Sequence, residues 1–62
     1  MRLDAYKMKK FQAMYDECES DSEFYIRLIN EEGIFYDDDI KEIMGRVTGS
    51  DDAYFNALSE GC

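Results

Sequence analysis

Carboxylates are the side chains of this sequence with the most evident capacity for chemistry. The run Asp37-Asp38-Asp39, with Glu42 close behind it, offers oxygen atoms of the kind that bind divalent cations. A calcium loop also needs a central glycine and a closing glutamate at fixed spacing, and neither is found at the required position. We therefore expect the run to serve the N-terminus of a helix, and we predict no metal site.

Two further acidic pairs, Glu31-Glu32 and Asp51-Asp52, could in principle act as an acid and a base. Adjacent residues of a helix point in different directions, so neither pair is a good catalytic dyad. Glu31 and Glu32 fall at the end of a predicted helix, where the helix dipole disfavours negative charge. Because folding alone does not explain that placement, we regard them as secondary candidates for a partner-binding surface.

The groups that most often perform catalysis are missing from the sequence. It contains no histidine, no glycine-rich phosphate loop and no histidine partner for Cys18. A chain of 62 residues also has difficulty enclosing a small-molecule pocket of roughly 300–1,000 Å³. We predict that the protein is not an enzyme, has no catalytic residues and uses no cofactor.

Four helix-sized segments separated by turn signals would have to position the acidic groups. The first extends from about Leu3 to Glu19, and the second begins with a capping box at Ser20 and stops at Gly33. The third opens with the three aspartates. The fourth follows a cap at Ser50, with Asp51 and Asp52 in its first turn, and ends at Gly61. The prediction is one all-α domain over residues 1–62, a small bundle of three to four short helices.

Apolar residues at spacings of three and four define the expected core. Its members are Phe11, Met14, Tyr15, Phe24, Leu28, Ile29, Ile40, Ile43, Val47 and Leu58. Cys18 and Met44 lie on the same stripes, and Tyr54 and Ala57 are expected to face inward with Leu58. The connector Ile34-Phe35-Tyr36 is expected to close one end of the core, with Ile34 against Ile29. Tyr6, Tyr36 and Phe55 are expected at the surface.

Charge is distributed unevenly along the chain, whose formal net charge is -8. Residues 1–10 carry four basic groups against one acid, which gives +3, and residues 11–62 carry 14 acids against three basic groups, which gives -11. An acidic body repels nucleic acids and anionic membranes and attracts basic protein surfaces. A predicted third helix with only Lys41 and Arg46 as basic residues also argues against direct DNA binding. The alternative is that the acids only keep a small protein in solution.

These observations predict a non-catalytic protein-binding module, in its sharper form an acidic inhibitor that occupies the basic nucleic-acid-binding surface of a partner. In size and charge the chain resembles small phage-encoded antagonists of host defence, including anti-CRISPR proteins and DNA mimics, a resemblance of class that carries over no residue. The candidate binding residues are Asp37, Asp38, Asp39, Glu42, Asp51 and Asp52, with Tyr36 and Tyr54 nearby and Glu31 and Glu32 second.

Two other interpretations remain open. In the first, the surplus of aromatic residues forms a homodimer of a small regulatory or structural protein through Tyr6, Tyr36 or Phe55. In the second, the basic N-terminal residues Lys7, Lys9 and Lys10 bind nucleic acid. Because the start of the sequence has no apolar leader and the chain has only two cysteines, we predict a cytoplasmic protein.

Overall fold

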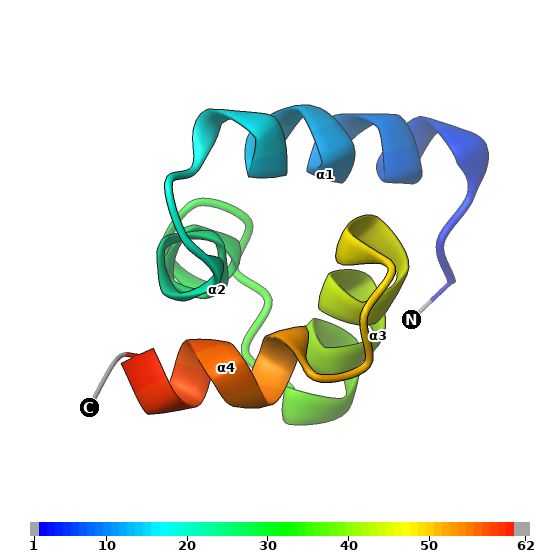
Figure 1. The fold of residues 1–62 in the computed structure, drawn as a ribbon. Coiled ribbons are helices and arrows are strands. Elements are labelled where there is room, and N and C mark those ends of the chain that lie inside the picture. The colour runs from blue at the N-terminus through cyan, green and yellow to red at the C-terminus, as the bar shows by residue number, and fades with distance from the viewer. Residues whose placement is uncertain (1, 61–62) are drawn as a thin grey trace.

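The structure, a computed structural model, describes residues 2–60 and contains four helices joined by short turns (Figure 1). Within that range there is no β-strand, so the prediction of a small all-α bundle is confirmed. The helices are α1 (Ala5–Glu17), α2 (Asp21–Asn30), α3 (Asp37–Thr48) and α4 (Ala53–Glu60). The expected end of the last helix at Gly61 lies outside the described residues.

The four helices are arranged around a shared apolar centre. In Figure 1, α1 crosses the top of the molecule and α4 crosses the bottom, with α2 and α3 between them. The most extensive packing joins α2 to α4, while α3 packs against each of the other three helices. The arrangement places the first turn of α3 on the α4 side of the molecule, away from α1.

The core is largely the predicted one. Of the expected members, seven are buried, and Tyr15 and Ile29 are partly buried against them. Leu58 is a correction, because its side chain is 38% exposed. Tyr54 and Ala57 of α4 are buried as predicted, and Ala53 is buried with them. The five largest fully buried side chains are Phe24, Leu28, Ile40, Ile43 and Met44.

Side-chain caps fix the starts of the first two helices. The Asp4 carboxylate accepts a hydrogen bond from the Lys7 amide at 2.8 Å, so the helix begins after Asp4 and not at Leu3. At α2 the Ser20 hydroxyl accepts from the Glu23 amide at 3.3 Å, as expected of a capping box. The Glu23 carboxylate, however, accepts from the Glu19 amide at 2.8 Å, one residue before the cap.

Gly33 ends the turn after α2 with a φ of 68°, a conformation that favours glycine. The amide of Ile34 then donates to the Leu28 carbonyl at 3.1 Å, and the Ile34 side chain is buried. Phe35 departs from the expectation that the connector closes one end of the core, because its side chain is exposed, whereas the exposure of Tyr36 agrees with its predicted place at the surface.

The acidic residues near α3 lie inside its first turn, and those near α4 lie in the turn before it. Tyr36 is the N-cap residue of α3 and makes no side-chain capping hydrogen bond, so Asp37–Asp39 form the first turn. Asp51 and Asp52 lie in a turn before α4 and not inside its first turn, which corrects the prediction. There the Ser50 hydroxyl accepts from the Asp52 amide at 3.3 Å. The helix dipole still favours carboxylates close to either helix start.

The molecule has the surface area of an ordinary compact monomer. Its accessible surface is 4164 Å², and the scaling relation for a chain of its mass gives roughly 4,200 Å². Among residues 2–60 no helix combines the length and the apolar character that crossing a membrane would require.

Candidate protein-binding surface

A shallow depression runs along the outer face of α3 and is closed on one side by the α3–α4 turn. Its volume is about 470 Å³, and we call it the α3 groove. It is lined by Asp38, Lys41, Glu42, Gly45, Arg46 and Asp51. Because Gly45 has no side chain, nothing fills the floor, and a Cβ atom there would lie 3.8 Å from the Asp51 carboxylate. The structure thus brings together three of the predicted acids.

The groove contains basic groups that partly offset those acids. Arg46 pairs with Glu42 one helical turn before it at 3.6 Å, and the Lys41 ammonium lies 5.1 Å from the ring centre of Phe55 on α4. Three acids and two basic residues leave a net charge of -1 in the groove itself. Over residues 37–52 the balance is six acids to two basic residues, or -4. The negative charge therefore belongs to the wider surface around the groove.

Tyr54 serves the core and not the surface. Its side chain is only 8% exposed, and its ring lies 6.0 Å from that of Tyr25. Burial raises the pKa of the Tyr54 phenol above its usual value of 10.0, and the nearby negative charge of Asp37 raises it further. Asp37 consequently lies beside the α3–α4 contact, outside the groove lining. We leave Tyr54 out of the candidate surface.

Glu31 and Glu32 have partners within the chain, which explains their unfavourable place near a helix C-terminus. The Glu32 carboxylate lies 2.7 Å from the Lys10 ammonium of α1. Glu31 accepts from the Arg27 guanidinium at 2.6 Å and 3.3 Å, and this contact lowers the pKa of the Glu31 carboxyl. Glu32 therefore joins the turn after α2 to α1, while Glu31 pairs with a residue of α2 itself, and we also leave both out of the candidate surface.

Phe35 and Tyr36 form the most exposed aromatic surface next to the acidic residues. Their side chains are 66% and 69% exposed, and their ring centres are 5.4 Å apart. The pair directly precedes Asp37, so apolar and anionic groups adjoin at the start of α3. Tyr36, Tyr6 and Phe55 are all exposed as the sequence predicted, whereas the exposure of Phe35 was not foreseen.

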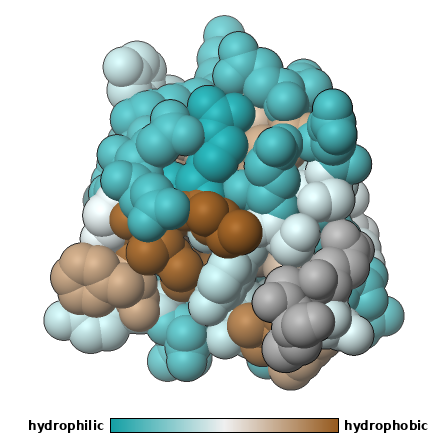
Figure 2. Space-filling view, turned by 90° about the vertical axis from the view of Figure 1, so that its left-hand side faces the viewer, coloured by the Kyte–Doolittle hydropathy of each residue, from teal (hydrophilic) through white to brown (hydrophobic). Residues whose placement is uncertain are grey.

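A second acidic region, not selected from the sequence, lies at the corner between α1 and α2. It comprises Asp16, Glu17, Glu19, Asp21 and Glu23, five acids within eight residues. Several of its groups have partners inside the chain: Asp21 accepts from the Tyr15 hydroxyl, and Glu17 lies 3.6 Å from Arg27. Figure 2 shows polar surface over this upper part of the molecule. The sequence shows this density of acids. Because residues 20–23 were interpreted as a capping box, the region was not considered as a binding surface.

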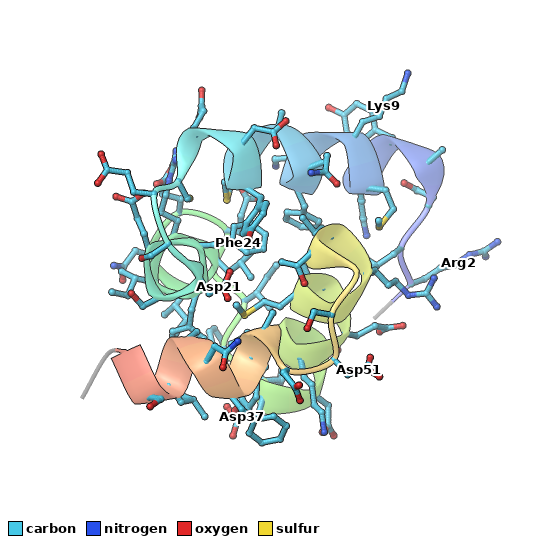
Figure 3. The ribbon with its side chains drawn as sticks, viewed as in Figure 1. Arg2, Lys9, Asp21, Phe24, Asp37 and Asp51 are labelled. Carbon is cyan, nitrogen blue, oxygen red and sulfur yellow. The ribbon has the colours of Figure 1, made fainter. Side chains whose placement is uncertain are left out.

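Lys9 of α1 lies on the opposite side of the molecule from the start of α3 (Figure 3). Figure 3 shows Lys9 extending outward from α1 at the top, while Asp37 lies at the bottom beside α4. Arg2 also projects away from the body of the protein, and Asp51 lies in the α3–α4 turn (Figure 3). The uneven charge of the sequence is therefore also uneven in space.

Within residues 2–60 no cluster of three or more His, Cys, Asp or Glu side chains has an arrangement suited to holding a metal ion. Comparison of the chain with protein-family models, with curated proteins and with solved structures finds no match. The functional argument therefore depends on the surface described above.

Proposed function

We propose that this protein is a non-catalytic binding module, an acidic inhibitor that occupies a basic nucleic-acid-binding surface of a partner protein. The observation that carries the proposal is that exposed aromatic rings and exposed carboxylates lie next to each other at the start of α3. Phe35 and Tyr36 adjoin the first turn of α3, and the groove that follows adds Asp38 and Asp51.

The physical basis is that apolar and charged groups contribute differently to a protein interface. Apolar rings that lose contact with water supply affinity, while the surrounding charges govern the rate of association and the choice of partner. Net charges of -8 for the chain and -4 for residues 37–52 favour a basic partner. Carboxylates spaced along a helix can take the positions that phosphates take on such a surface.

The test is capture of partners from the native host on immobilised protein, followed by elution with a salt gradient. An interaction governed by exposed charges weakens as ionic strength rises, so a true partner should elute at moderate salt and should itself bind nucleic acid. Added nucleic acid should compete for it. Absence of any salt-sensitive partner with a basic surface would contradict the proposal.

A matched pair of variants separates the candidate surface from charge in general. Asp38→Asn/Asp51→Asn/Asp52→Asn and the control Asp16→Asn/Glu17→Gln/Glu19→Gln each change the formal net charge from -8 to -5. If residues around the α3 groove bind the partner, the first variant should lose capture and the second should retain most of it. Equal losses would mean that only the total charge matters.

Exposed apolar residues favour the homodimer as a second candidate function. Besides the aromatic residues, Ile26 of α2 is 50% exposed and Leu58 of α4 is 38% exposed. Figure 2 shows apolar surface gathered in the middle of the face that it presents, below the polar upper part. A dimer joined by such a face would hold or tighten at high salt, and sedimentation at low and high salt would detect it.

A further inference from the structure

The backbone is hydrogen-bonded on both sides of the Phe35–Tyr36 pair, and both rings face solvent. On one side Ile34 is buried, and its amide donates to the Leu28 carbonyl at 3.1 Å. On the other side the Tyr36 carbonyl accepts from the Ile40 amide at 3.0 Å. The two rings also contact each other, with their planes 40° apart. Because the flanking backbone is already ordered, binding at this pair does not have to order that segment of the chain.

The negative charge beside the two rings indicates which chemical group of a partner they can bind. Exposed carboxylates of Asp37 and Asp38 follow Tyr36 directly, so a neutral apolar group would leave them unmatched at the edge of an interface. A cation would meet both needs, because aromatic faces and carboxylates attract it alike. The protein already contains one such contact, in which Lys41 lies over the ring of Phe55. Within residues 2–60, Phe35 and Tyr36 take part in no comparable contact.

We propose that Phe35 and Tyr36, together with the carboxylates of Asp37 and Asp38, form an anchor for an arginine side chain on the basic surface of the partner. This inference rests on the proposed function and names the chemistry of its contact. Arginine fits better than lysine, because its planar guanidinium stacks on a ring and donates two hydrogen bonds to one carboxylate. Lysine offers a compact, strongly hydrated charge without the plane.

The anchor can be tested with defined peptides before any partner is known. Labelled oligo-arginine and oligo-lysine peptides of equal length are titrated with the whole protein at low salt. We expect tighter binding of the arginine peptide. The variant Phe35→Leu/Tyr36→Leu keeps apolar side chains but removes both rings, and should weaken arginine-peptide binding by about five- to thirtyfold. Phe55→Leu, the control for loss of an exposed ring, should stay within about twofold of the unmodified protein.

Three results would overturn the anchor. The first is equal affinity for the two peptides, and the second is unchanged binding by Phe35→Leu/Tyr36→Leu. The third is self-association that depends on the two rings, seen in sedimentation, because the occupant would then be a second copy of the chain with its basic residues Arg2, Lys7 and Lys9. Circular dichroism of each variant confirms that it is folded.

Failure of the anchor and failure of the proposed function give different results. If Phe35→Leu/Tyr36→Leu still captures a salt-sensitive partner while Asp38→Asn/Asp51→Asn/Asp52→Asn does not, the inhibitor proposal stands and the arginine anchor is wrong. If arginine binding depends on the rings but no basic partner is captured from the host, the anchor stands and the inhibitor proposal is wrong.

Discussion

The hydroxyl of Tyr15 on α1 donates a hydrogen bond to the Asp21 carboxylate, at the start of α2, over 2.9 Å. The Tyr15 ring also meets Phe24 edge-on, with ring centres 5.2 Å apart and planes at 72°. One side chain thus fastens the α1–α2 turn through its polar end and adds to the core through its ring. The contact also engages one acid of the α1–α2 corner in holding the fold.

The first prediction concerns stability in alkaline solution. The hydrogen bond to Asp21, and secondly burial, raise the pKa of the Tyr15 phenol above 10.0. Between the unfolded and folded pKa values the unfolded chain loses a proton that the folded chain keeps, so the free energy of unfolding falls as pH rises. Stability should therefore be unaffected by this group below about pH 10 and should decline above it.

Tyr15→Phe provides the check. At neutral pH it should lower the free energy of unfolding by about 1 kcal/mol, because a hydrogen bond to a partly exposed carboxylate is lost. It should also reduce the decline above pH 10, leaving the contribution of Tyr54, whose pKa is raised too. Urea unfolding at several pH values, with phenolate absorbance as the titration signal, measures both effects. An unchanged alkaline decline would contradict the assignment.

A second prediction uses two leucines that sequence patterning treats alike. Leu28 is fully buried and Leu58 is 38% exposed. Leu28→Ala should cost about 2–5 kcal/mol, enough to unfold a domain of this size, whereas Leu58→Ala should cost less than about 1 kcal/mol. Thermal unfolding followed by circular dichroism compares them. Similar losses from the two substitutions would show that α4 is rotated relative to the structure described here.

A third prediction concerns the glycine inside α3 and the glycine that follows its last residue. Gly45 lies in the helix interior, where a Cβ would meet no atom closer than 3.8 Å. Gly45→Ala should therefore stabilise the protein by about 0.5–1 kcal/mol. Gly49 ends the helix with a φ of 76°, so Gly49→Ala should destabilise it by about 1 kcal/mol. Urea midpoints that move in the same direction for both variants would contradict this assignment.

The sequence predicts the fold best where one periodic pattern continues over several turns. In α3 the residues Ile40, Ile43, Met44 and Val47 are all buried, as their spacing requires. The helix of eight residues, α4, is too short for such a pattern to determine its rotation, and Leu58 was assigned to the wrong side. The connector failed for a related reason, since apolar composition alone cannot separate buried Ile34 from exposed Phe35.

The candidate surface was less predictable because charge pairing depends on packing. Nothing near Glu32 in the sequence reveals that Lys10 of α1 will lie 2.7 Å from it. Likewise, Asp38 and Asp51 reach one groove only because α3 turns back at Gly49. Counting acidic residues in the sequence locates the regions of negative charge. Which of those carboxylates pair with groups of the same chain depends on how the helices pack.

The last prediction separates the two halves of the α2 capping arrangement by the amide that each protects. Ser20→Ala removes the acceptor of the Glu23 amide and should cost about 1 kcal/mol, with faster hydrogen exchange at Glu23. The Glu23 carboxylate accepts a hydrogen bond from the Glu19 amide at 2.8 Å, so Glu23→Ala should instead accelerate hydrogen exchange at Glu19. Ser59→Ala, on the exposed side of α4, should change neither amide. If both substitutions accelerate the same amide, the two bonds do not act independently, and the start of α2 opens as one unit.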